Sequence, residues 1–188
     1  MVFGLLLVDV IILVVLIALV IYIILMFNGF ISLRNNIGKA WANIDVILKQ
    51  RNDELPNLVE TVKGYMKHEK ETLFMLTKAR TAWASATTLN KKAAVSNVIT
   101  DAVKSIFAVA ENYPTLKANE NFLKLQERIS GLENEIADRR EFYNESVTRY
   151  NTRTQSFPDL ILAGIFGFKP AEWFKATEEE KQQVKASF

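Results

Sequence analysis

Residues 10–27 read VIILVVLIALVIYIILMF, a run without a charge, a glycine or a proline. A helix of this length covers about 27 Å at roughly 1.5 Å per residue, close to the roughly 30 Å of hydrocarbon in a bilayer. The run therefore predicts a transmembrane helix. We take residues 1–27 as a membrane anchor and the lipid bilayer as the first partner that the sequence implies.

The charges around this run predict its orientation. No Lys or Arg precedes it, so the basic start of a cleaved signal peptide is missing, and we interpret the run as an uncleaved anchor. Arg34, Lys39, Lys49 and Arg51 follow it. Because an excess of Lys and Arg stays on the cytoplasmic side, we expect a single-pass protein with its N-terminus outside and the rest of the chain in the cytoplasm.

Asp9 directly precedes the run, and two interpretations stay open. Residues 10–27 can span the bilayer unaided, which leaves this carboxylate at the level of the outer headgroups, within reach of water. Alternatively, Phe3–Val8 also lie in hydrocarbon and Asp9 faces a neighbouring subunit, where an intramembrane carboxylate marks a contact or an ion path.

The predicted membrane helix continues beyond the bilayer. From Phe30 to Ile47 apolar residues recur at intervals of three and four, the spacing of a helix that packs one face against a partner. The stripe continues on both sides of Pro56 without a turn sequence, so we expect a kink there and not a reversal. We interpret the polar residues 67–72 as a solvated continuation of the helix, in preference to a break in it.

Two more helices are predicted further along the chain. Apolar spacing indicates one over Val95–Ala110, which Tyr113-Pro114 ends because proline disfavours helical geometry in the residue before it. The other has a heptad pattern that begins at Phe122 and extends to Tyr150. No stretch alternates with a period of two over a useful length, so a β-sheet is not supported.

These patterns predict an all-α fold in which an N-terminal transmembrane helix continues into a cytoplasmic up-and-down helical bundle. We place the bundle at residues 28–176 and a polar C-terminal tail at 177–188. The apolar segment Leu160–Phe174 is too short to span a bilayer. It could cap the bundle, lie at the membrane surface or pack on another subunit.

Several runs carry a family resemblance. They are AWANIDV (40–46), PNLVETVKGY (56–65) and YPTLKANENF (113–122), with Phe157-Pro158 and Gly167-Phe168 further along. The chain resembles the LemA family over most of residues 33–174. The resemblance implies a bacterial-type protein anchored in the inner, cytoplasmic membrane with its N-terminus outside, a helical bundle in the cytoplasm, and no established catalytic activity.

Residues that could carry chemistry are few. The chain has no cysteine and one histidine, His68, which stands in a charged patch and is interpreted as solvated. Glu133, Glu135 and Asp138 are followed by two arginines, a pattern typical of an exposed helical face. No phosphate-binding glycine motif is present, and a net charge of +2 gives no footprint for nucleic acid. We therefore expect no enzyme, no cofactor, no metal site and no nucleic-acid partner.

Asparagines stand beside the apolar stripes of the predicted helices. A buried asparagine can fix the register of packed helices at some cost in stability. Asn57, Asn144 and Asn151 are therefore expected either to set the pairing of the bundle or to bind the backbone of a partner. The aromatic residues near the stripes are interpreted as core residues.

The length of the first helix suggests a function. If Asn28–Thr87 is helical throughout, it extends about 90 Å, whereas Val95–Tyr113 returns only about 28 Å. Leu33, Ile37, Ile44 and Ile47 then lack a cover within the chain, and neighbouring copies would supply it. This predicts a non-enzymatic membrane scaffold that forms a homo-oligomer. The alternative is a membrane-tethered sensor or adaptor that recruits a cytoplasmic protein.

Overall fold

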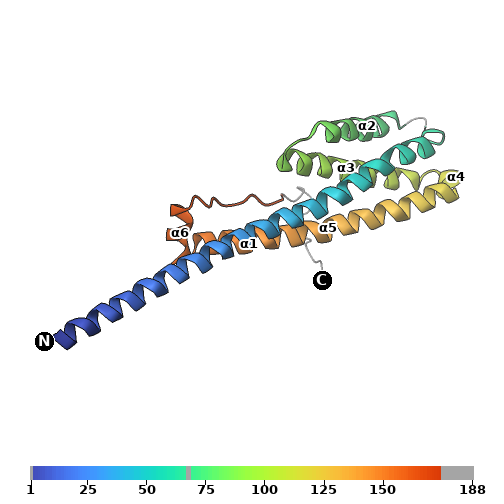
Figure 1. Ribbon diagram of the computed structural model, residues 1–188. Helices are drawn as coiled ribbons and strands as arrows, with labels where there is room; N and C mark the ends of the chain where they lie inside the picture. The colour runs from blue at the N-terminus through green and yellow to red at the C-terminus, as the bar shows by residue number, and fades with distance from the viewer. Residues whose placement is uncertain (1, 67–68, 175–188) are drawn as a thin grey trace, which may run out of the picture. The chain divides into compact units, whose positions relative to one another are not determined.

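The computed structural model describes residues 2–66 and 69–174. These residues form helices joined by short connections and contain no strand (Figure 1), which confirms the predicted all-α fold. His68 and the predicted tail at 177–188 lie outside the described residues. The helices are α1 (Val2–Lys63), α2 (Lys70–Ser85), α3 (Leu89–Ala110), α4 (Pro114–Lys117), α5 (Glu120–Gln155) and α6 (Asp159–Ile165).

Helix α1 is continuous over 62 residues and includes Pro56 in its interior. The prediction that the membrane segment continues into the following helix without a reversal at Pro56 is thus confirmed. The predicted solvated helix over 67–72 is wrong, because α1 ends at Lys63 and α2 begins at Lys70. The break lets α2 bury its apolar face, including Leu76 and Trp83, which an extended helix would leave in water.

The chain divides into two compact units, which we describe separately. Unit 1 contains residues 1–40 and 144–173, and unit 2 contains residues 41–143 together with Phe174. Both α1 and α5 contribute residues to each unit.

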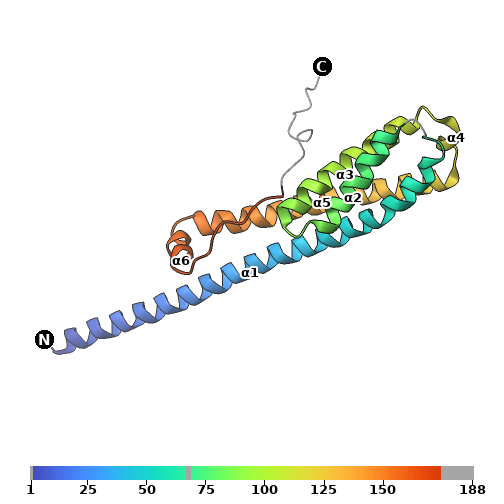
Figure 2. The same cartoon turned by 90° about the horizontal axis from the view of Figure 1, so that it is seen from above.

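Unit 2 is a helical bundle in which α2 and α3 lie beside the 41–63 part of α1 and the 120–143 part of α5 (Figures 1 and 2). The apolar faces predicted for the second and third helices are buried here, for example Ile106 and Ile129. Ile44 and Ile47 are also buried, with 0% and 5% of their surface exposed. The prediction that neighbouring copies cover these two residues is therefore wrong, because helices of the same chain cover them.

Unit 1 has a smaller apolar core. Met26 and Phe30 of α1 are buried together with Ala163 of α6, and Leu162 and Phe168 pack against them. Leu33 and Ile37 of the predicted oligomer stripe are half-buried, so a neighbouring copy as their cover stays a prediction. In the N-terminal part of α1 the apolar side chains are exposed from Leu6 to Tyr22.

Candidate functional site

The exposed apolar part of α1 is the first functional surface. Within the described part of the chain, two helices are long and apolar enough to cross a membrane, namely the Leu6–Lys63 part of α1 and α3. In α3 the apolar residues Ile99, Val103 and Ile106 are buried in the bundle, which explains their hydropathy without a membrane. Side chains from Val8 to Val20 in α1 have no such cover. Asp9 is exposed within this run, and its role stays a prediction.

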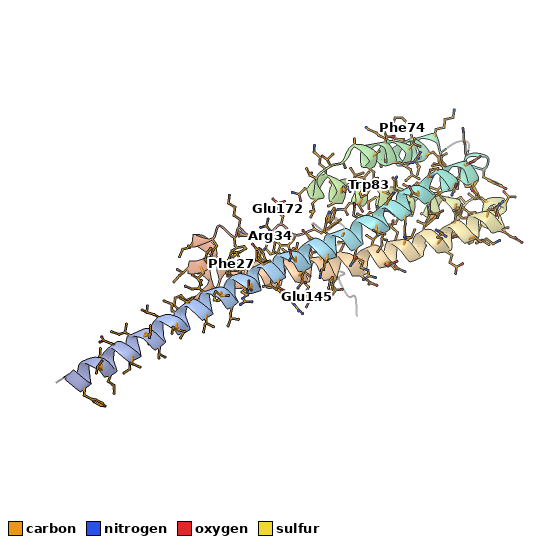
Figure 3. All side chains as sticks on the ribbon, viewed as in Figure 1. Phe27, Arg34, Phe74, Trp83, Glu145 and Glu172 are labelled. Carbon is orange, nitrogen blue, oxygen red and sulfur yellow. The ribbon has the colours of Figure 1, made fainter. Side chains whose placement is uncertain are left out.

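Aromatic rings join this part of α1 to the segment around α6. The ring of Phe27 lies 5.1 Å from that of Phe166 and 5.7 Å from that of Phe168, measured between centroids. Phe30 and Phe168 are 5.0 Å apart in the same way. Figure 3 shows Phe27 on the side of α1 that faces α6. The C-terminal part of unit 1 is thus attached to α1 where the uncharged run ends.

An ion pair and a glycine complete this junction. The guanidinium of Arg153 in α5 lies 5.6 Å from the centre of the Phe30 ring and donates a 2.8 Å hydrogen bond to Asp159. A side chain at Gly29 would place its Cβ only 2.6 Å from Nη1 of Arg153. Glycine at this position lets the guanidinium approach the backbone of α1.

The extended segment after α6 is held by polar side chains of α5. The turn into it uses Gly167 at a φ of +71°, a conformation that favours glycine. Tyr150 donates a 3.0 Å hydrogen bond to the carbonyl of Lys169. Asn151 donates to the carbonyl of Ala171 at 2.9 Å and accepts from its N–H at 2.8 Å. The backbone that Asn151 binds therefore belongs to its own chain.

The other predicted asparagines have different surroundings. Asn144 is half-buried in α5. Asn57 is exposed on α1 and donates a 3.4 Å hydrogen bond to Glu54, so it takes no part in setting the bundle's register.

A buried polar network in unit 2 was not predicted. Arg51 of α1 is 0% exposed, and its guanidinium donates to Glu133 of α5 at 2.7 Å and to Ser96 Oγ of α3 at 2.9 Å. Thr100 accepts a third bond from Arg51 at 2.8 Å. The earlier interpretation of Glu133 as a residue of an exposed face is wrong, because this carboxylate is largely covered and paired with Arg51.

Burial controls the electrostatics of this network. Desolvation lowers the pKa of Arg51 from its ordinary value, while the nearby charge and hydrogen bond of Glu133 act in the opposite direction. Arg140 also donates to Ser96 Oγ, at 2.9 Å. A guanidinium has no lone pair with which to accept a proton, so neither arginine can activate Ser96 as a base would. The network therefore fits a structural role.

A metal-binding arrangement is not found among residues 2–66 and 69–174. Over these residues no group of three or more His, Cys, Asp or Glu side chains could hold a metal ion.

A second open surface lies in unit 2, where the end of α1 meets the start of α2. It is a groove of about 1060 Å³ with a mainly apolar lining. Phe74 is 67% exposed beside it, and Figure 3 shows this side chain on α2. Among the described lining residues two are lysines and none is acidic. The lining residues are Val59, Lys63, Met66, Lys70, Leu73, Phe74 and Thr77.

These features define a class of protein. A long uncovered apolar helix, a helical bundle and open apolar surfaces describe a membrane-associated helical protein. The model of the LemA family matches residues 40–188, and the chain belongs to this family.

Curated relatives carry two kinds of name. The chain is 24% identical over 175 residues to magnetosome protein MamQ 2 of Paramagnetospirillum magneticum, with 79% of this chain and 64% of the relative covered. It thus spans slightly less than two thirds of that protein's length. It is 22% identical over 186 residues to MamQ of Magnetospirillum gryphiswaldense, covering 85% of this chain and 68% of the relative. Protein LemA of Metamycoplasma hominis is 26% identical over 161 residues, covering 85% and 74%.

Proposed function

We propose that this LemA-family protein is a non-enzymatic scaffold, held at the membrane by α1, whose unit 2 recruits a protein partner. The groove between α1 and α2 is the observation that carries the proposal. Following the charges around the anchor, we place the N-terminus outside and unit 2 in the cytoplasm, with the anchor in the inner membrane.

The lining of the groove indicates the chemistry of the partner. Phe74 and Leu73 offer an apolar surface, and a fully buried Met66 forms part of the lining. Lys63 and Lys70 add positive charge, and none of the lining residues that the structure describes is acidic. An amphipathic helix buries its apolar face in such a groove, and acidic residues at its edge would pair with the lysines. We therefore expect the partner to present an amphipathic helix with acidic flanks.

Photocrosslinking in cells tests this proposal. A photoreactive amino acid replaces Phe74, and a matched variant carries it at Val98, which is 46% exposed on α3 of the same unit. We expect a discrete adduct with another protein from position 74 and none from position 98. Replacing both Lys63 and Lys70 with Glu should reduce the yield of that adduct severalfold. Equal labelling at the two positions contradicts the proposal, and so does an adduct yield that is unchanged when both lysines are replaced.

Self-association is a second candidate function. Its original reason fails for Ile44 and Ile47, but Leu33 and Ile37 keep part of their surface free in unit 1. An adduct at position 74 of twice the chain's own mass would favour this candidate. The mass of the gently extracted protein, measured by light scattering, gives the number of copies directly.

A further inference from the structure

An exposed apolar surface surrounds α6 in unit 1. Ile165 is 70% exposed and Phe157 is 83% exposed, which is unusual for large apolar side chains outside an interface. The other members have between 44% and 55% of their surface exposed. We call this set the α6 patch, and it comprises Phe157, Leu160, Ile161, Ile165 and Phe166.

The centre of the patch carries no charge. Residues 160–168 read LILAGIFGF, between Asp159 and Lys169. Asp159 is the acid nearest to the patch in the sequence, and its carboxylate accepts the 2.8 Å hydrogen bond from Arg153. The side chain of Asp159 is only 17% exposed. The ion pair thus neutralises this carboxylate, whose free charge would oppose contact with an apolar medium.

Contacts with α1 fix the depth of the patch relative to the anchor. If residues 10–27 fill the hydrocarbon core, Phe27 lies at its cytoplasmic boundary. Phe166 belongs to the patch and packs on Phe27 at 5.1 Å. The patch is thus continuous with the uncovered apolar surface of α1 and lies at the depth where that surface ends.

Positive charges stand next to the patch on the side away from the anchor. Arg34 of α1 and Lys169 are exposed, and together with Phe168 they line the same small cleft. A basic edge beside an apolar face is typical of segments that lie in the interface of a bilayer, where the cations meet lipid phosphates. A protein partner would not require this order of apolar and basic residues along the axis of α1.

We propose that the α6 patch inserts into the cytoplasmic interface of the bilayer, as a second lipid contact beside the α1 anchor. This inference rests on the part of the proposed function in which α1 crosses the membrane. With lipid contacts at both the anchor and the α6 patch, unit 1 could not rotate freely about the axis of α1. The occupant of the patch is therefore lipid, not a second copy of the chain or a cytoplasmic protein.

The chain contains no cysteine, so a single one can be labelled without altering a native thiol. Ile165→Cys carries an environment-sensitive fluorophore in the full chain, reconstituted into vesicles of phosphatidylcholine and phosphatidylglycerol. Val98→Cys, exposed in unit 2, is the matched control in water. Val15→Cys, exposed in the anchor, is the control in lipid. Quenching is measured with a nitroxide lipid and, separately, with aqueous iodide.

We expect the probe at Ile165 to be quenched by the nitroxide lipid severalfold more than the probe at Val98. Iodide quenching as strong as at Val98 overturns the inference. Protection from both quenchers shows a second copy on the patch and also overturns it. If the nitroxide lipid quenches the probe at neither position 15 nor position 165, α1 does not cross the membrane, and the proposed function is also wrong. Lipid contact at Val15 alone leaves the anchor intact and overturns only the α6 inference.

A second variant tests the apolar character of the patch without depending on one labelled position. The probe is moved to Leu160→Cys, and Ile165→Glu is added. Because Ile165 is mostly exposed, the glutamate leaves the fold of unit 1 intact, and circular dichroism checks this. We expect nitroxide quenching at position 160 to fall severalfold. Unchanged quenching contradicts insertion of the patch.

Discussion

Two stretches of α1 lie in one uninterrupted helix and have opposite surroundings. From Val10 to Tyr22 nearly every side chain is apolar and exposed. From Ile44 to Val62 the apolar residues form a stripe, and the stripe is buried by helices of unit 2. The comparison shows that a helix with a uniformly apolar surface is predicted to lie in lipid. An apolar stripe predicts only that some other helix covers that face.

The stretch within unit 2 also holds a buried charge, and the largest expected effect follows from it. Replacing Glu133 with Gln leaves the buried Arg51 guanidinium without its counter-charge. We expect the free energy of unfolding to fall by about 3–4 kcal/mol. Denaturant titration of the full chain in detergent measures this. The matched control is Glu135→Gln, at a side chain of α5 that is 46% exposed. It should change stability by less than about 0.5 kcal/mol. A loss of similar size in both variants would contradict the claim that Glu133 stabilises the fold by pairing with Arg51.

Removing apolar bulk should separate the two stretches of α1. Leu58 is 0% exposed, and Leu58→Ala is expected to cost about 3 kcal/mol of stability through the lost contacts and the cavity left behind. Ile17→Ala, at an exposed position of the anchor, should leave the unfolding of unit 2 unchanged. The same denaturant titration compares the two variants, and equal destabilisation would contradict the division.

Adding a charge should affect the anchor stretch of α1 and leave the stretch in unit 2 unaffected. Ile17→Asp is expected to disfavour membrane insertion by about 2.5 kcal/mol, because the carboxylate enters the centre of the predicted span. The control is Gln50→Asp, at an exposed position of α1 in unit 2. The fraction of protein that resists alkaline extraction from membranes measures insertion. Equal extraction of both variants and the parent chain argues against a span at residues 10–27.

A smaller effect is expected where α5 holds the extended segment of unit 1. Asn151→Leu removes both hydrogen bonds to Ala171 and should cost about 1–2 kcal/mol. Hydrogen exchange at the Ala171 amide should speed up severalfold, while Asn57→Leu, at an exposed position, leaves it unchanged. Protection of this amide in the Asn151 variant would show that the pair of hydrogen bonds is dispensable.

The smallest effect concerns pH. Burial raises the pKa of Tyr150 above its ordinary value of 10.0, and Arg34 opposes this shift. A group whose pKa is higher in the folded state than in the unfolded state contributes to stability. This contribution is fully present below the unfolded pKa and is lost as pH rises through the folded pKa. Stability should therefore decline above about pH 10 less steeply in Tyr150→Phe than in the parent chain. Parallel declines in thermal melts across that range would refute the assignment.

The sequence predicted the helices better than their partners. The heptad pattern from Phe122 to Tyr150 correctly indicated a helix with one buried face. The expected oligomer followed from comparing the length of the first helix with the second predicted helix alone. That comparison left out α5, which has 36 residues, and Ile44 and Ile47 are in fact buried within unit 2. Periodicity gives the face that a helix buries and no information on which helix fills it.

Arg51 shows a signal that the sequence offered and the interpretation missed. It continues the spacing of the apolar stripe between Leu48 and Leu55, so a helix that buries these leucines also buries the arginine. An arginine at such a position requires polar partners from the covering helices. Ser96, Thr100 and Glu133 come from distant parts of the chain, and no local pattern could have named them.

The sequence by itself determined the candidate span, the helical class, the continuation of α1 through Pro56 and the family, because composition, spacing and residue runs are local properties. The tertiary structure alone decided the reversal between α1 and α2, the cover of Ile44 and Ile47, the pairing of Arg51 with Glu133 and the packing of Phe166 on Phe27. These features bring together residues far apart in the chain. Their free energy depends on the surface that the assembled helices remove from water, which no single stretch encodes.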